Sequence, residues 1–508
     1  MLSSVESNMT STHELGITIG KTEDFGQWYQ QIITKCELID YYDISGCYVL
    51  LPNSYSIWEM IQRYLDDEFK LRGVKNVYFP LFITKRNLEM ETAHIEGFSP
   101  EVAWVTKTGN SDLTQFKTNP DGSTTRDESN YIAVRPTSEC AIYPIVANHI
   151  RSYMDVPLKY NQWCSVVRWE FKDATPFIRS REFLWQEGHT CHRTKESAME
   201  EVNDILDLYQ QCYREVLAIP TIRGYKTEKE KFSGADMTAT IETYIPGANR
   251  AIQCATSHCL GQNFSKLFNI TFKDENNKTQ HVWQNSWGFT TRSIGVMIMT
   301  HGDNKGVVYP PHIAPIQIGI IPIIFKNSKD VVMNYIGEVM GVLKRDFRLH
   351  IDMSNHHAGW KQNYYEVMGA PIKLEIGPKD VENGSVRLVR RDTLEKIDIK
   401  FDDQIVSKIN NIFGMIHEGM YNRALEQLNQ SVVLIDTWDG FCKTVADQRL
   451  CLTAFCNETP CEEAIKEETG AKSLCIPKDK EYVVDIDGKS CVKCGKAAKT
   501  HCLFGRSY

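Results

Sequence analysis

The stretch RSREFLWQEGHTCH (residues 179–192) gives the clearest indication of the fold. Aromatic and polar residues alternate in it, which is typical of a β-strand, and on a strand Phe183, Trp185 and Glu187 share one face. A second strand-like run, VVRWEF (residues 166–171), lies just before it, and KDATPFIRSR joins the two. The pattern predicts an antiparallel hairpin with arginines at its tip, where they could clamp a triphosphate.

The end of the same stretch has a second interpretation, because His189, Cys191 and His192 could all bind a metal. Their His-x-Cys-His spacing is not one that structural zinc sites use, and no second pair of ligands lies nearby in the sequence. We therefore expect these three side chains to pack beyond the site rather than to hold a metal.

The composition is that of a globular protein with several domains. The 508 residues are 42% hydrophobic and 24% charged, and no apolar run approaches the roughly 20 residues of a membrane helix. The N-terminus has neither the basic start nor the apolar block of a secretory signal. A formal net charge of -8 argues against a generally basic nucleic-acid coat but allows a local basic face. The 16 cysteines are scattered, which is typical of a reducing compartment such as the cytoplasm.

The pattern of expected helices and strands changes along the chain and predicts several domains. In the first half, strand-like runs alternate with amphipathic helices, which are expected over 53–72, ended by Gly73, and over 195–217. A polar, turn-rich loop is expected over 118–130. The predicted segments are a polar tail (1–21), a first large domain (22–308), an α/β unit (309–430) and a cysteine-rich end (431–508).

Three short motifs contain charged side chains that could each bind a charged ligand or an ionic partner. In RPTSE, Thr137 and Glu139 share a face if the segment is a strand, which suits an ammonium group, although for this motif taken alone we favour a solvated strand edge. Arg168 and Glu170 share a face of an otherwise apolar strand, so Arg168 needs a carboxylate, a phosphate or a salt bridge. Arg292 opens a long apolar helix, where the helix dipole disfavours a cation, so we expect it to bind an anionic ligand.

A further cluster lies in AIQCATSHCLGQNF, where Gln253, Thr256 and His258 fall within a short strand-and-turn segment. Cys254, His258 and Cys259 could again suggest a metal site. We favour core cysteines beside a histidine that lines a pocket.

Two close cysteine pairs lie near the C-terminus, Cys456-x4-Cys461 and Cys491-x2-Cys494. Two such pairs separated by a loop are a strong signal for structural zinc, and the alternative is four free thiols.

In this order, the segments resemble the motifs of a class II aminoacyl-tRNA synthetase. GCYVLLPNSYSIWEMI and VKNVYFPLF are similar to motif 1, VVRWEF and RSREFLWQEGH to motif 2, and GFTTRSIGVM to motif 3. RPTSE, TEKEKFSGAD and TSHCLGQNFSK resemble the prolyl-tRNA synthetase family in particular. The resemblance extends from about Thr22 to the terminal LFGRSY.

The resemblance implies the fold and the reaction. It implies an α+β catalytic domain with the antiparallel class II sheet flanked by helices, an α/β anticodon-binding domain and a small α/β zinc-binding domain. The implied enzyme is a cytoplasmic homodimer that activates L-proline with ATP and Mg²⁺ and transfers it to tRNA(Pro), with a structural Zn²⁺ in its tail. The chain between motifs 2 and 3 is too short for the editing insertion of many bacterial relatives, so we expect no internal clearing of alanyl-tRNA.

The resemblance also assigns residues. Proline would be bound by Thr137, Glu139, Arg168, Phe183, Trp185, Phe232 and His258. ATP would be bound by Arg168, Glu170, Phe171, Arg179, Gln253, Thr256, Thr290 and Arg292. The catalytic group would be Arg168, Glu170, Arg179 and Arg292. A loop over the substrate would contain Glu101 and Val102. The anticodon would be read by Glu366, Lys373, Lys379 and Asp380. Zinc would be held by Cys456, Cys461, Cys491 and Cys494.

Two residues depart from what relatives often carry, Cys259 beside His258 and Lys373 in place of an arginine. Lys373 lacks the bidentate geometry of arginine. Two other functions stay open: a synthetase for another small amino acid such as threonine, and a non-catalytic, synthetase-like RNA-binding protein. RPTSE argues against the first, and the intact Arg168, Arg179 and Arg292 argue against the second.

Overall fold

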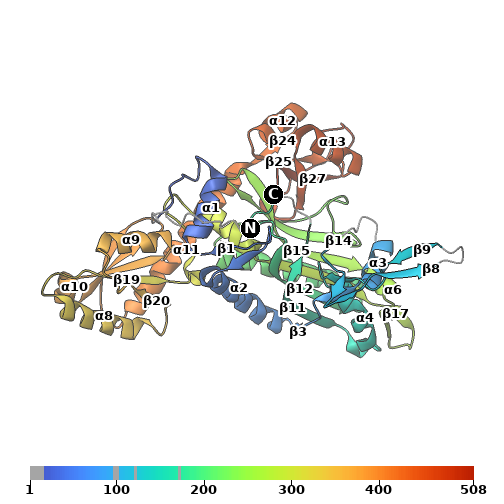
Figure 1. Cartoon of the computed structure of the whole chain (residues 1–508). Coiled ribbons are helices and arrows are strands. Elements are labelled where there is room, and N and C mark those ends of the chain that lie inside the picture. The colour runs from blue at the N-terminus through green and yellow to red at the C-terminus, as the bar shows by residue number, and fades with distance from the viewer. Residues whose placement is uncertain (1–15, 95–101, 119–122, 170–172) are drawn as a thin grey trace, which may run out of the picture. The chain divides into compact units, whose positions relative to one another are not determined.

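The computed structural model describes residues 16–94, 102–118, 123–169 and 173–508 (Figure 1). The chain divides into two compact units. The larger contains residues 40–49, 57–300 and 421–508, and the smaller contains residues 1–39, 50–56 and 301–420. The domain boundaries expected from the sequence, at residues 22, 309 and 431, stay predictions.

An eleven-stranded sheet runs through the larger unit in the order β24-β25-β27-β26-β13-β14-β15-β18-β12-β11-β3. Its middle is antiparallel, as expected for the catalytic domain. The middle strands and the short edge strand are β11 (Leu158–Val167), β12 (Glu182–His192), β13 (Ile222–Tyr225), β14 (Met237–Ile245), β15 (Arg250–Gly261), β18 (Trp283–Thr290) and β3 (Lys75–Asn76).

The hairpin predicted from the opening stretch is present. Strands β11 and β12 pair antiparallel over their whole length, and Val167 faces Glu182 at the end that leads to the arginine loop. The backbone N–H of Arg168 also donates to the carbonyl of Arg181, 2.7 Å away, which closes the hairpin one residue further.

Helices cover the face of the sheet opposite the cavity described below. The rings of Phe69 on α2 (Pro52–Leu71) and Trp287 on β18 lie 4.8 Å apart, and the Asn285 side chain donates to the Ala198 carbonyl of α5 (Lys195–Gln211) at 2.9 Å. Gly73 adopts a positive φ of 75° just after α2, as its predicted role at the helix end requires. Helix α5 continues into a π-helical turn, Cys212–Val216.

Two local predictions were wrong. The segment RPTSE is not a strand, because Ser138 caps helix α4 (Glu139–His149) and Glu139 is its first residue. Part of the loop expected over 118–130 is a hairpin of β8 (Gln115–Thr118) and β9 (Thr124–Asp127), since β-branched threonines favour a strand even in a polar segment.

The remaining elements of the larger unit are short. They are β1 (Ile39–Tyr41), β2 (Tyr48–Leu50), β4 (Phe82–Thr84), α3 (Lys85–His94), β5 (Trp104–Val105), β6 (Lys107–Thr108), β7 (Ser111–Asp112), β10 (Ile132–Val134), α6 (Asn263–Leu267), β16 (Thr271–Lys273), β17 (Thr279–His281) and α7 (Arg292–His301).

The C-terminal residues extend the same sheet. Strand β26 pairs antiparallel with β13, so the C-terminal strands are continuous with the catalytic sheet. The elements are β24 (Val432–Ile435), α12 (Trp438–Ala446), β25 (Leu450–Phe455), α13 (Thr459–Thr469), β26 (Lys472–Pro477) and β27 (Thr500–Gly505). Helices on a small mixed sheet give the α/β domain that the resemblance implied.

The smaller unit contains a five-stranded sheet in the order β20-β19-β21-β22-β23, parallel across β20, β19 and β21 and antiparallel beyond. Alternating strands and helices give the expected α/β unit. Its elements are α1 (Phe25–Lys35), β19 (Ile318–Pro322), α8 (Lys329–Leu343), β20 (Leu349–Ile351), α9 (Ala358–Val367), β21 (Ile372–Ile376), α10 (Pro378–Asn383), β22 (Ser385–Arg390), β23 (Lys396–Lys400) and the start of α11 (Ile405–Ser431). Among the described residues, no helix has the length and apolar character to cross a membrane.

Candidate active site

A cavity of about 340 Å³ lies on the open face of β12, β15 and β18 in the larger unit. It brings together most of the residues assigned to proline and ATP. Those that line it are Thr137, Glu139, Arg168, Arg179, Phe183, Trp185, Phe232, Gln253, Thr256, His258, Thr290 and Arg292. Glu101, Glu170 and Phe171 lie outside the described residues. Val102 packs beside the cluster of Ile83, Leu88, Ala133 and Cys140 and does not line the cavity.

Aromatic rings form one wall of the cavity. Phe183 and Trp185 meet edge to face, with ring centroids 6.1 Å apart, because alternation along β12 turns both to the same side. The guanidinium of Arg168 lies over both rings, 5.5 Å and 5.3 Å from their centroids. Phe232 and His258 lie 4.8 Å apart and come from other segments. The wall is apolar and has a cation at its edge.

Acceptors for an ammonium group lie at the start of α4. The Thr137 hydroxyl donates to the Glu139 carboxylate in a short hydrogen bond, and both residues line the cavity. Glu139 is almost fully buried and is the first residue of a helix, where the dipole favours an anion. A buried anion beside an apolar wall is suited to bind a small organic cation.

Three arginines gather around the other part of the cavity. Arg168 Nε donates to the Pro136 carbonyl at 3.0 Å, and Arg292 donates to the carbonyls of Ile178 and Gln253 at 3.2 and 3.3 Å. Burial lowers the pKa of Arg292, and the charges of Arg168 and Arg179 lower it further. Like charges that repel one another in a buried place favour a polyanionic ligand, as predicted for Arg292.

His258 is neutral in this environment. Burial lowers its pKa to about 3, with a further contribution from the charges of Arg168 and His189. The Thr238 hydroxyl accepts a hydrogen bond from the Phe232 N–H at 2.9 Å and lies 2.9 Å from His258 Nδ1. A neutral imidazole has one ring nitrogen that donates and one that accepts, so His258 offers polar contacts within an otherwise apolar wall.

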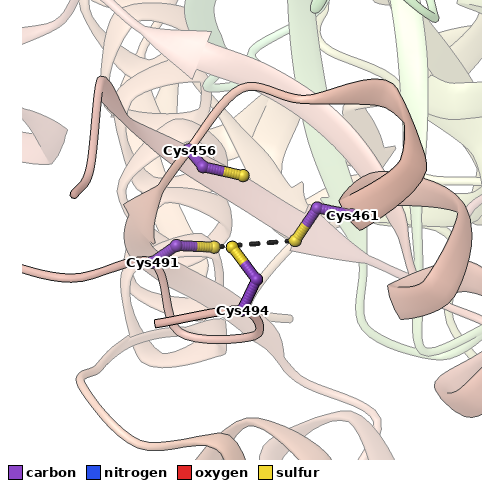
Figure 2. Close-up of side chains that lie close together, drawn as sticks. All are labelled: Cys456, Cys461, Cys491 and Cys494. Carbon is purple, nitrogen blue, oxygen red and sulfur yellow. Dashed lines mark hydrogen bonds between the residues drawn. The ribbon is translucent and has the colours of Figure 1, made fainter. Parts of the chain in front are cut away.

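A separate site is formed by the four cysteines of the C-terminal pairs (Figure 2). The sulfur atoms of Cys456, Cys461, Cys491 and Cys494 all lie within 4.8 Å of one another, and those of Cys461 and Cys491 are 3.6 Å apart. Zn–S bonds of about 2.3 Å in a tetrahedron require sulfur separations of roughly 3.8 Å. The four side chains therefore fit a tetrahedral metal.

Comparison with known proteins gives three matches of family regions. Residues 116–301 match the tRNA synthetase class II core domain (G, H, P, S and T), residues 317–411 match the anticodon binding domain, and residues 438–508 match the C-terminal region of prolyl-tRNA synthetase. The cytoplasmic proline–tRNA ligase of Arabidopsis thaliana is 46% identical over 502 residues, which cover 97% of this chain and 91% of that protein. The chain belongs to the prolyl-tRNA synthetase family.

Solved structures agree with this family membership. A crystal structure of prolyl-tRNA synthetase from Cryptosporidium parvum complexed with L-proline and AMP has a TM-score of 0.87 and 47% identity, and the match covers 97% of this chain and 100% of that one. A second, complexed with halofuginone and AMPPNP, has a TM-score of 0.90 and 47% identity over 99% and 100% of the two chains. The proline–tRNA ligase of Clostridium novyi is 45% identical over 96% of this chain and 97% of that protein.

His189 lies at the cavity, a position that its sequence did not lead us to expect. The residue lines the cavity, and its ring makes 3.1 Å contacts with the Glu187 carboxylate and the Tyr143 hydroxyl. The expectation that it packs beyond the site was wrong. Strand parity could have shown this, because residue 189 follows 183, 185 and 187 on the cavity face of β12. His192 has the opposite parity and contacts Glu201 instead.

Glu187 connects this histidine to the ammonium site of the synthetase. Its carboxylate accepts hydrogen bonds from the Ser138 N–H at 3.1 Å, from the Ser138 hydroxyl, and from Gln162 Nε2 at 2.8 Å. Burial lowers the pKa of His189, but Glu187 and Glu139 more than offset this and raise it. Burial alone would raise the pKa of Glu187, but the hydrogen bond and charge of His189 outweigh burial, so the pKa of Glu187 is lowered. A buried ion pair therefore fixes the backbone between Thr137 and Glu139.

We expect this ion pair to stabilise the fold most between pH 4.5 and 6.5, the ordinary pKa values of the two groups. The contribution of His189 is complete below 6.5 and is lost as the pH rises through its raised pKa. The contribution of Glu187 is complete above 4.5 and is lost as the pH falls through its lowered pKa. A tenfold change in a proton-binding constant corresponds to about 1.4 kcal/mol.

The measurement is the thermal unfolding midpoint of wild type and of the Glu187→Gln/His189→Gln double variant at about pH 5.5 and about pH 9. The wild-type advantage should be larger at the lower pH. An advantage that is the same at both values would contradict the prediction.

The residues assigned to the anticodon lie in the smaller unit. Lys373 on β21 is buried and pairs with Glu366 on α9, which also binds Lys305 at 3.0 Å. Burial lowers the pKa of Lys373, and the opposing effect of the Glu366 carboxylate, which raises that pKa, is smaller. Asp380 accepts from the Gly377 N–H at 2.8 Å at the start of α10, and Lys379 is exposed. Glu366 and Lys373 therefore form one polar cluster, and Lys379 and Asp380 lie together on α10.

Proposed function

We propose that the enzyme activates L-proline with ATP and transfers the prolyl group to the 3′ end of tRNA(Pro). The observation that carries the proposal is the single cavity in which an apolar wall, an ammonium acceptor and three arginines meet. Family membership supports it, as does the C. parvum structure complexed with L-proline and AMP.

Each part of proline has a counterpart in the cavity. The Glu139 carboxylate and the Thr137 hydroxyl would bind its ammonium group. Phe183, Trp185 and Phe232 would enclose the ring, where a close apolar fit selects for size. Arg168 would bind the carboxylate, and the neutral His258 ring would lie beside Phe232 in the same wall.

In the first step, a carboxylate oxygen of proline attacks the α-phosphorus of ATP in line, the bond to the bridging oxygen breaks, and pyrophosphate leaves. Arg168, Arg179 and Arg292 neutralise the charge that develops on the phosphates, and positioning accounts for most of the rate enhancement. Mg²⁺, when bound, would add charge neutralisation at the triphosphate, with the Gln253 side chain as an oxygen donor of the kind that it prefers. The 3′-terminal hydroxyl of tRNA then attacks the prolyl carbonyl carbon, and AMP leaves.

The test is ATP–pyrophosphate exchange with proline and with threonine as the amino acid. Exchange that depends on proline supports the proposal, and exchange with threonine alone would contradict it. A chain that binds tRNA but shows no exchange with any amino acid would favour the non-catalytic alternative.

Further parts of the proposal concern the assembly. A structural Zn²⁺ held by Cys456, Cys461, Cys491 and Cys494 would tie together the loops around it. Exposed apolar side chains in the motif 1 segments, among them Val49, Tyr55, Tyr78 and Phe82, support a homodimer. The A. thaliana relative is named cytoplasmic, and we propose the same location for this enzyme.

Glu366→Gln is expected to raise the KM for tRNA about tenfold or more in aminoacylation while leaving proline-dependent exchange unchanged. The carboxylate is proposed to accept from a base edge of the unstacked anticodon, and one such contact is worth about 1–3 kcal/mol. Glu375→Gln is the matched control, because Glu375 lies on β21 and is bound instead by Gln362 at 2.7 Å. Equal KM values for the two variants would contradict the assignment.

A further inference from the structure

A chain of hydrogen bonds links the C-terminal strand β26 to the ATP end of the cavity. Lys226 Nζ donates to the Leu474 carbonyl and to Glu242 Oε1, both at 2.7 Å. The Thr240 hydroxyl donates to the same oxygen of Glu242 at 2.7 Å, and Gln253 Nε2 donates to Thr240 Oγ1 at 3.4 Å. Glu242 and Thr240 are buried and the Lys226 side chain is only 9% exposed, whereas Gln253 reaches the cavity.

A β-bulge brings the last two members together. Along β14 and β15, Ile241 faces Ala255, but Glu242 faces Gln253, so Cys254 is the extra residue. In a regular ladder Gln253 would face Thr243, whose hydroxyl donates away from this chain, to the Pro220 carbonyl at 2.8 Å. Bulges next to active sites commonly redirect a side chain, and this one turns Gln253 toward the buried charge.

The charge of Glu242 fixes the direction of every bond in the chain. An ionised carboxylate can only accept, so the Thr240 hydroxyl must donate to it. A second contact of that hydroxyl, to the Ala255 carbonyl at 3.5 Å, also requires it to donate. The Thr240 oxygen is therefore left as an acceptor, and Gln253 must offer its NH₂ group. The amide oxygen of Gln253 is then the atom that remains for the cavity.

Lys226 forms an ion pair with this carboxylate. Burial lowers the pKa of Lys226, but the Glu242 carboxylate more than compensates and raises it. The lysine in turn is held by β26, and the next residue is held there too, because the Thr227 and Ser473 hydroxyls lie 3.2 Å apart.

We propose that Lys226, Glu242 and Thr240 are positioning residues that orient the Gln253 side chain with its oxygen toward Mg²⁺-bound ATP. A magnesium ion or its bound water requires an oxygen acceptor, and a flipped amide would present N–H donors instead. The C-terminal domain takes part, because a carbonyl of β26 anchors the lysine. The inference rests on the proposed use of ATP.

Thr240→Val tests this chain of hydrogen bonds from Lys226 to Gln253, here called the relay, with little change in side-chain shape. Titration calorimetry of the full-length enzyme with AMPPNP and Mg²⁺ should show about five- to tenfold weaker binding, the size expected for one oriented hydrogen bond. In exchange assays the KM for ATP should rise by a similar factor while the KM for proline stays the same. Thr243→Val is the matched control, since it makes the same change at a buried site on the same strand.

Glu242→Gln provides a second variant if Thr240→Val folds poorly. It keeps the shape of the side chain but removes the charge, so its amide can donate to Thr240 and allow Gln253 to flip. The same selective loss of AMPPNP affinity is expected. If Thr240→Val and Glu242→Gln both bind AMPPNP as tightly as wild type, the relay is overturned but the proposed function is not. The same holds if Thr243→Val loses as much AMPPNP affinity as they do. A wild-type enzyme that fails to bind AMPPNP would overturn the proposed function, and the relay with it.

Discussion

Arg168→Gln is expected to lower kcat/KM for proline-dependent ATP–pyrophosphate exchange about 1000-fold. Arg168 lies over both Phe183 and Trp185, so it stands between the wall proposed for proline and the arginines proposed for the phosphates. It is therefore placed to bind both reacting groups, the proline carboxylate and the α-phosphate. Removal of one charged donor from a developing oxyanion costs about 10²–10³ in rate, and this side chain would serve two groups.

Arg181→Gln is the matched control for this prediction. Arg181 belongs to the same hairpin but does not line the cavity, and its side chain donates to the Ser45 carbonyl at 3.0 Å and lies over Trp169. Its exchange activity should stay within about threefold of wild type, in the range of ordinary substitutions outside a site. Similar losses in both variants would show that the hairpin as a whole, rather than the Arg168 charge, had been disturbed.

Much of the site could be predicted because its residues follow simple periodicities. Phe183 and Trp185 alternate along one strand, and Arg292 opens an apolar helix, so local patterns were sufficient to single them out. The resemblance supplied what no pattern could, namely that Phe232 and His258 come from distant segments to the same wall. It also identified proline as the substrate.

The failures have physical causes. Thr137 and Glu139 were expected on one face of a strand, but Ser138 starts a helix, and a helix start brings the same two side chains together by a different route. The relay to Gln253 depends on the bulge at Cys254, and a single inserted residue in a ladder has no signature in composition or spacing. Tertiary pairing, rather than local preference, decided both cases.

The continuity of the sheet gives the C-terminal domain two structural tasks. It carries the cysteine cluster, and through β26 it continues the sheet that includes β15, a strand lining the cavity. Glu462, which follows Cys461, accepts from the Ser473 hydroxyl at 2.5 Å, and Ser473 lies beside Thr227. The helix that carries Cys461 therefore contacts β26, the strand whose Leu474 carbonyl anchors Lys226, so a loss of order at the cluster should also weaken ATP binding.

Cys461→Ser is expected to reduce bound zinc from about one equivalent per chain to a small fraction and to lower the thermal unfolding midpoint by at least 10 °C or so. A structural zinc contributes on the order of 10 kcal/mol to the folding of small zinc domains, far more than a buried thiol. Cys461 lies in the first turn of α13, and loss of this ligand would release that helix from the turn around Cys491. Metal analysis and calorimetry of the purified full-length enzyme measure the two effects.

Cys451→Ser is the control for this variant. Cys451 is buried in the same core, and its thiol contacts the Phe441 carbonyl rather than the other cysteines of the cluster. The change should cost about 1–3 kcal/mol, as expected for placing a hydroxyl in an apolar site, and should leave zinc at one equivalent. If wild-type enzyme contains no zinc, or if Cys461→Ser retains it, the four thiols are packing groups. The stability of the domain would then come from its apolar core alone.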